Sequence, residues 1–239
     1  MSQGHNLFET ITSNLAPVHR DGWKFVGIAG GLALLFWLLL PFSLLAYVLL
    51  GLTAYVAYFF RDPERVTPLR EGLVVAPADG RVSSIEVIRP PAELQLGDEP
   101  RQRISIFLSV FDVHINRAPI AGRVVRSIYV PGAFLNAALD KASEDNERRS
   151  LVIAQPNGTE IAVVQIAGLI ARRIVTFKGE GTSVGVGERF GLIRFGSRVD
   201  VYLPPGKTGL VAVGQRAVAG ETVLADLKST EPEREARAS

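Results

Sequence analysis

Cysteine is absent from this sequence of 239 residues, and histidine is scarce. Without cysteine the chain forms no disulfide, offers no thiolate to a metal and has no cysteine nucleophile. Its three histidines, His5, His19 and His114, form no cluster able to supply a histidine-rich metal site. We therefore expect no metal site.

A concentrated basic stripe is also missing. The formal net charge is only +2, and no run of lysine and arginine is interleaved with aromatic residues. Nucleic-acid binding would lead us to expect such a stripe. The basic residues that flank the long apolar segment of the chain suit an anionic membrane surface better, and we expect no nucleic-acid partner.

The segment from Phe25 to Phe60 contains no charged residue. As one straight helix this run would extend about 54 Å, well beyond a hydrocarbon core of roughly 30 Å. Pro41 lies near its middle, so we predict a membrane hairpin of two short helices, over residues 25–40 and 43–60. Each helix is near the lower limit for crossing a bilayer, which leaves a re-entrant hairpin open.

The flanks of the apolar run predict its orientation. Arg20 and Lys24 precede it, three arginines follow it within ten residues, and the turn carries no charge. Because positive residues stay in the cytoplasm, residues 1–24 are predicted to be a cytoplasmic N-terminal segment. The remainder is then a cytoplasmic domain tethered to the cell membrane.

We predict a β-rich domain over residues 61–227. The charged tail, residues 228–239, has no apolar face and is expected to be disordered. "DGRVSSIEVI" at 79–88 resembles "AGRVVRSIYV" at 121–130, which indicates a short duplication. Strands that turn at glycine-marked corners are typical of a barrel-sandwich fold. The predicted fold class is therefore mainly β and barrel-sandwich-like, with an N-terminal α-helical membrane hairpin.

Short alternating runs mark the expected strands, and only two short helices are expected in this domain, at Phe134–Lys141 and Gly168–Arg173. The expected strands are Leu73–Ala76, Arg81–Ile88, Arg103–Leu108, Gly122–Val130, Ser150–Gln155, Glu160–Ile166, Ser183–Val186, Leu192–Phe195, Arg198–Tyr202 and Gly209–Val213.

Gly196-Ser197, in "ERFGLIRFGSRVDVYLP", is the only Gly-Ser dipeptide in the chain. A serine that follows a glycine is usually part of a turn. The nucleophile elbow of a hydrolase needs Gly-x-Ser-x-Gly before a helix, whereas here the chain continues into a strand. The residues alone leave a turn and a reactive serine open.

Two further residues are candidates. His114, in "SVFDVHINRAPIAG", is the only histidine of the β-rich domain and follows an apolar run, so a structural and a functional role are both open. Asp79, in "VVAPADGRV", precedes a glycine between strands, where an aspartate often does no more than cap a turn.

Taken together, these motifs resemble the phosphatidylserine decarboxylases, in their short membrane-anchored form. The resemblance runs over nearly the whole chain, from the apolar hairpin that ends in "FFRDPER" through "VVAPADGRV", "SVFDVHINRAPIAGRV" and "QIAGLIARRIV" to "ERFGLIRFGSRVDVYLP". It implies a phospholipid substrate, phosphatidylserine, that is converted into phosphatidylethanolamine. It also implies a carboxy-lyase made as a zymogen.

The resemblance further implies that the chain cuts itself between Gly196 and Ser197. Ser197 would become a covalent pyruvoyl group, the cofactor that forms a Schiff base with the substrate amine. The products would be a β chain of residues 1–196 and an α chain of residues 197–239 that stay together as a heterodimer, with homo-oligomers left open. Ser197, His114 and Asp79 are the catalytic residues that the resemblance implies.

One position departs from the pattern. Larger relatives carry a second histidine three residues after the first, where this chain has Arg117. Either His114 serves both self-processing and decarboxylation, or processing uses another base. Two other readings of the residues stay open, a membrane-anchored barrel-sandwich binding or adaptor module that is never cleaved and a serine hydrolase that acts on lipid.

Overall fold

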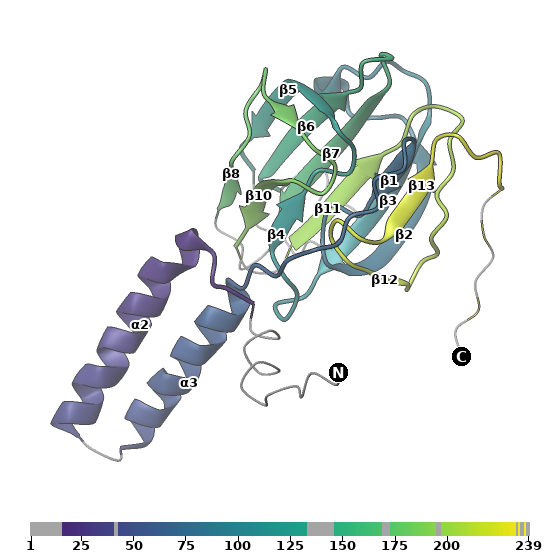
Figure 1. The fold of residues 1–239 in the computed structure, drawn as a ribbon. Coiled ribbons are helices and arrows are strands. Elements are labelled where there is room, and N and C mark those ends of the chain that lie inside the picture. The colour runs from purple at the N-terminus through teal and green to yellow at the C-terminus, as the bar shows by residue number, and fades with distance from the viewer. Residues whose placement is uncertain are drawn as a thin grey trace, which may run out of the picture. The chain divides into compact units, whose positions relative to one another are not determined.

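The computed structural model describes residues 16–40, 43–132, 146–168, 173–194 and 197–232, together with residues 234 and 237. It divides into two compact units, residues 1–64 and residues 65–239. The first contains two helices and the second contains the strands (Figure 1). The helix expected over Phe134–Lys141, most of the helix expected over Gly168–Arg173, and Gly196 lie outside the described residues.

Two apolar helices, α2 (Arg20–Leu39) and α3 (Leu44–Phe59), pack against each other in the first unit. The helix α2 begins earlier than the charge-free run because the ring of His19 accepts a hydrogen bond at its N-terminus, so a polar first turn can join the helix. Ser43 caps α3 in the same way, with 3.3 Å between its Oγ and the nitrogen of Ala46. A hairpin of two helices is therefore confirmed.

Large apolar side chains point outward along both helices, among them Leu38, Leu44 and Val48. Because exposed leucine over a whole helix is costly in water, these faces need an apolar covering. In the described part of the chain, α2 alone is long and apolar enough to cross a membrane, with a mean hydropathy of 1.6, and α3 is a shorter apolar helix.

The second unit contains the strands of three antiparallel sheets. Their bounds are β1 Leu73–Val75, β2 Gly80–Ile88, β3 Arg101–Leu108, β4 Ile115–Arg117, β5 Gly122–Val130, β6 Arg148–Ala154, β7 Glu160–Ala167, β8 Ile174–Thr176, β9 Ser183–Val184, β10 Arg189–Ile193, β11 Ser197–Tyr202, β12 Arg216–Ala217 and β13 Val223–Asp226. A 3-10 turn, η1, spans Ala92–Leu94.

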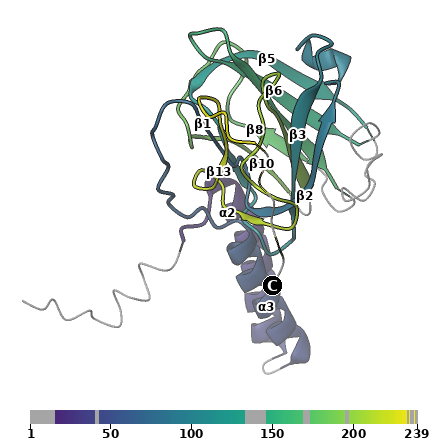
Figure 2. The same ribbon diagram turned by 90° about the vertical axis from the view of Figure 1, so that its right-hand side faces the viewer.

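The largest sheet has eight strands in the order β12-β2-β3-β11-β7-β6-β5-β9, and it curls on itself (Figure 1). A three-stranded sheet, β4-β10-β8, and the pair β1-β13 complete the domain. The strands β1 and β13 come from opposite ends of the unit and lie side by side in both views (Figure 1, Figure 2). The predicted fold class, mainly β with an N-terminal helix pair, is confirmed.

Apolar side chains fill the inside of the curl. Ile106, Leu108 and Val199 belong to this main core, and all three are fully buried. A smaller cluster, which includes Leu94 of η1 and Tyr202, covers the outer face of the central strands. Both faces of β11 are therefore buried along its whole length.

The strand order is symmetric about the β11–β7 pair, which divides all strands but β8 into two halves. The first half comprises β1, β2, β3, β11, β12 and β13, and the second half comprises β4, β5, β6, β7, β9 and β10. Both β2 and β5 are nine residues long and begin with a glycine. Each has a bulge after its third residue, Val82 in β2 and Val124 in β5. The two Gly-Arg-Val segments thus begin strands of equal length with a bulge at the same position.

Several details of the expected strands change. Residues 209–213 do not form a strand, because only Gly209 bridges to β13 and the amide of Ala212 bonds the side chain of Gln215 in a turn. The strands β4, β8, β12 and β13 were not expected. Each has only two to four residues, too few for a visible alternation.

Candidate active site

Ser197 is the first residue of β11, the fourth strand of the eight-stranded sheet. It lies between Leu108 of β3 and Ala167 of β7. Because opposite residues of antiparallel strands share a face, its side chain points into the main core, as do those of both neighbours. Ser197 is fully buried, and within the described residues its Oγ has no hydrogen-bond partner.

An unpaired buried hydroxyl is unusual, because most buried polar atoms in folded proteins are hydrogen-bonded. A serine that served only as a turn residue would bond a nearby backbone group. The position of Ser197, inside a sheet and with no hydrogen-bond partner for its Oγ among the residues that the structure describes, suits a group that reacts.

His114 is buried immediately before β4. Its flanking residues Val113 and Ile115 form an apolar cluster with Leu192. Its Nδ1 lies 2.9 Å from the carbonyl oxygen of Asp112. A carbonyl only accepts, so Nδ1 carries the proton and, in the neutral ring, Nε2 carries the lone pair.

Asp79 lies at the start of β2, at the same end of the eight-stranded sheet as Ser197. Its carboxylate accepts from Nη2 of Arg65 and from the nitrogen of Ala219, each at 2.8 Å. Burial raises the pKa of Asp79, the nearby charge of Asp112 adds to this rise, and the hydrogen bond from Ala219 and the charge of Arg65 oppose it. The described contacts of Asp79 are therefore with Arg65 and Ala219, not with His114.

Asn116 and Gln165 form a buried polar pair that the sequence patterns did not single out. Asn116 is on β4, Gln165 is on β7, and Nε2 of Gln165 donates to Oδ1 of Asn116 at 2.7 Å. The pair connects the two sheets at the site. Gln165 interrupts the apolar run "IAVVQIA", and this single polar residue on a core face was the available signal.

Other arginines of the region have structural partners. Arg117, which replaces the second histidine of larger relatives, donates to the carbonyl of Gly187 at 3.0 Å. Arg198 is buried on the outer face of β11 and pairs with Asp200 at 2.9 Å. Neither is placed as a base for Ser197.

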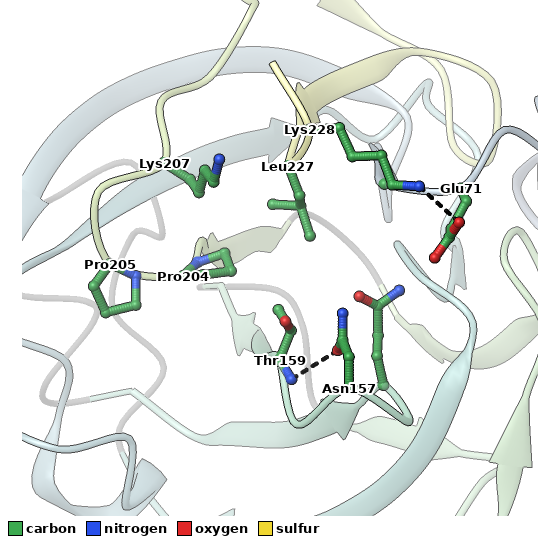
Figure 3. Close-up of a pocket in the computed structure, with 10 residues that line it drawn as sticks. Glu71, Asn157, Thr159, Pro204, Pro205, Lys207, Leu227 and Lys228 are labelled. Carbon is green, nitrogen blue, oxygen red and sulfur yellow. Dashed lines mark hydrogen bonds and ion pairs between the residues drawn. The ribbon is translucent and has the colours of Figure 1, made fainter. Parts of the chain in front are cut away.

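A pocket of about 180 Å³ lies at the other end of the sheet (Figure 3). Thr159 and Asn157, in the turn between β6 and β7, form one wall. Lys228, which pairs with Glu71 at 2.7 Å, forms the opposite rim. Ser197 and His114 are not among its lining residues, so this pocket is separate from the candidate site.

Comparison with known proteins places the chain in a family. Residues 52–225 match the family model described as phosphatidylserine decarboxylase. The chain is 60% identical over 227 residues to a phosphatidylserine decarboxylase proenzyme of Xanthobacter autotrophicus, an alignment that covers 95% of this chain and 96% of that protein. A protein of the same name from Nitrobacter winogradskyi is 57% identical, with 93% of this chain and 89% of that protein covered.

A third proenzyme of that name, from Azorhizobium caulinodans, is 59% identical, with 92% of this chain and 94% of the relative covered. The chain thus belongs to a class of decarboxylases, and its relatives are named as proenzymes. The chain is a member of the phosphatidylserine decarboxylase family.

Proposed function

We propose that this protein decarboxylates phosphatidylserine to phosphatidylethanolamine, after cutting its own chain between Gly196 and Ser197. The observation that carries this proposal is the buried hydroxyl of Ser197 at the start of a central strand, which has no hydrogen-bond partner in the described part of the chain. Family membership supports the substrate and the reaction, because the relatives are named for both.

Self-processing begins at Ser197 itself. Its Oγ bonds the carbonyl carbon of Gly196 and loses its proton, the C–N bond of the peptide breaks, and the amine of residue 197 takes up a proton. The resulting ester is then eliminated, because loss of the Cα proton breaks the Cβ–O bond and leaves Gly196 with a free carboxylate. Water then replaces the nitrogen of residue 197, which leaves as ammonia.

His114 is the base that we assign to the first proton. Its Nδ1 is held by the carbonyl of Asp112, so Nε2 is free of a proton in the neutral ring. A buried imidazole held by this hydrogen bond is suited to accept a proton without first reorienting. The same ring can later return a proton to the α-carbon of the substrate, so one histidine serves both steps.

Ser197 fits as the precursor of a pyruvoyl group. It is buried in an apolar interior with an unpaired oxygen, and the two strands beside it fix its backbone. When present, that group supplies a carbonyl that binds the substrate amine and withdraws electrons as carbon dioxide leaves. The apolar surroundings disfavour a carboxylate, which promotes its loss.

The helix pair α2–α3 is proposed to tether the domain to the cytoplasmic leaflet of the cell membrane. Its exposed leucines and the arginines and lysine at both ends support this arrangement. A substrate that stays in the bilayer is then close to the domain at all times.

Intact-mass measurement of the purified full-length protein tests self-processing. We expect two chains, residues 1–196 and 197–239, the smaller one without a free amine and reactive toward carbonyl reagents. Ser197→Ala should give one uncleaved, inactive chain. Ser105→Ala is the matched control, since Ser105 is also fully buried with an unpaired Oγ and lies on the other face of the sheet.

Activity on phosphatidylserine from a chain that stays in one piece would refute the proposal. An uncleaved chain that reacts with a fluorophosphonate at Ser197 would indicate a lipid hydrolase instead. An uncleaved and unreactive chain would indicate a membrane-anchored binding module.

A further inference from the structure

The amide pair Gln165–Asn116 is fully buried between two sheets, yet it leaves an acceptor unused. Gln165 Nε2 donates to Asn116 Oδ1 at 2.7 Å, while Gln165 Oε1 has no hydrogen-bond partner in the described parts of the chain. An unsatisfied buried amide destabilises a fold. Its presence therefore needs an explanation other than packing.

The unpaired oxygen of Gln165 lies on the same face of the sheet as Ser197. Ser197 is opposite Ala167, and Gln165 is two residues from Ala167 along β7. Such diagonal neighbours lie about 7–8 Å apart at their Cα atoms, which a long side chain can span. One residue therefore offers an unused acceptor and the other an unused hydroxyl donor, and the two chemistries are complementary.

The other half of the domain shows what these positions require for folding. Residues that pair across neighbouring strands form a row, and one row of the first half consists of Ile85, Ile104 and Val201. The matching row of the second half consists of Ser127, Leu151 and Val163. Two residues beyond Val201 comes Leu203, and two residues beyond Val163 comes Gln165. Leu203 is thus the counterpart of Gln165.

Asn116 also has an apolar counterpart. It is the middle residue of β4 and faces Gly191 of β10, as Val74 is the middle residue of β1 and faces Ala225 of β13. Val74 and Leu203 are fully buried members of the main core. The same architecture is therefore built with a leucine and a valine in one half and with two amides in the half that faces Ser197.

The backbone also makes room for the amides. A Cβ on Gly191 would lie 2.6 Å from the carbonyl oxygen of Val175 on β8 and 3.1 Å from Nε2 of Gln165. A side chain at this position would therefore collide with the β8 backbone and press on the amide of Gln165, whereas glycine leaves room for both.

We propose that Gln165 orients the hydroxyl of Ser197 for its attack on the preceding carbonyl, and that Asn116 is a positioning residue which holds the amide of Gln165. The inference rests on the proposed self-processing. As the Ser197 side chain turns toward the site, Oε1 of Gln165 accepts its hydrogen bond and fixes the rotamer before the attack. The hydroxyl has a single proton, so this hydrogen bond breaks when the proton passes to the base as the new C–O bond forms, and Gln165 itself takes no proton.

The test is the rate of chain cleavage in the full-length protein, followed by gel and intact mass after synthesis in vitro, with thermal unfolding measured alongside. Gln165→Leu and the double variant Gln165→Leu/Asn116→Val install the pair that the other half uses. We expect both to cleave about 10- to 100-fold more slowly, with unfolding midpoints that are unchanged or higher. Gln165→Glu keeps an acceptor oxygen and should cleave faster than Gln165→Leu.

Gln102→Leu is the matched control, because Gln102 is a buried glutamine of the same sheet whose Oε1 bonds the nitrogen of Gly209 at the other end. It should lose stability and still cleave at the normal rate. Cleavage of Gln165→Leu at the wild-type rate would overturn this inference alone. If Gln165→Leu does not fold, the cleavage rate of Asn116→Val is the test, and cleavage at the wild-type rate would overturn the inference. Absence of cleavage in the unmodified protein would instead refute the proposed function.

Discussion

At the scale of single residues, His114 offers a direct test of the proposed base. Because Nδ1 donates to the Asp112 carbonyl, removal of the ring takes away that hydrogen bond together with the proton acceptor. His114→Ala should slow self-cleavage about 100-fold or more, measured as the fraction of cleaved chain over time. His114→Gln keeps a polar side chain of similar size and should be equally slow. Normal cleavage and decarboxylation in both variants would remove His114 from the mechanism.

Asp79 gives a pH-dependent prediction. Burial raises its pKa in the folded state, so between its ordinary value and this raised value the folded chain holds more protons than the unfolded chain. Stability conferred by the neutral carboxyl is therefore present at low pH and is lost as pH rises through this window.

Asp79→Asn should remove this dependence. We would compare the unfolding midpoints of Ser197→Ala and Ser197→Ala/Asp79→Asn, both single chains, from about pH 4 to about pH 7. The chain that keeps Asp79 should gain stability relative to the double variant as pH falls. The opposite slope would mean that the ion pair with Arg65 outweighs burial.

At the scale of elements, Gly80 sets the start of β2 and therefore the position of Asp79. It has φ +156, and an added Cβ would collide with the carbonyl of Phe107 on β3. Gly80→Ala should lower the free energy of unfolding by about 3 kcal/mol or more, because backbone must move. Gly206→Ala is the control, with φ +71 and open space around it, and should cost about 1–2 kcal/mol. Equal losses in urea unfolding would contradict the collision.

The elements also show how far the sequence can be read. Long alternating runs such as Gly122–Val130 were predicted with the bounds that the structure has. The strand β4 was not predicted, because it is only three residues long, although it contains Asn116 and directly follows His114. Ser197 could be singled out by its motif, whereas its pairing with Leu108 and Ala167 depends on strands far away in the chain. Sequence patterns report local alternation, and the site is made by non-local pairing.

At the scale of the whole molecule, the division into two units predicts that the β domain is independent. Residues 65–239 contain the complete main core, including Val74, Val199 and Leu224. A chain that begins at residue 65 should therefore fold and cleave itself at the normal rate. Its decarboxylation of phosphatidylserine in vesicles should fall about tenfold or more relative to that in detergent micelles, because the shortened chain lacks the proposed tether that would concentrate the domain at the bilayer. Equal activity in both would show that the helices are not needed for access to lipid.

The central place of β11 governs the fate of the two products once the peptide bond before it is broken. The smaller product would supply β11 between β3 and β7, β12 beside β2 and β13 beside β1, so its strands are interleaved with those of the larger product. Separation would require opening the middle of an eight-stranded sheet. The two polypeptides should therefore not exchange between molecules. When an isotope-labelled sample is mixed with an unlabelled one, mass spectrometry should detect no molecule with one labelled and one unlabelled chain unless the protein is first denatured. The proposed self-cleavage would therefore create a new chain end at the candidate site without creating a subunit that can leave.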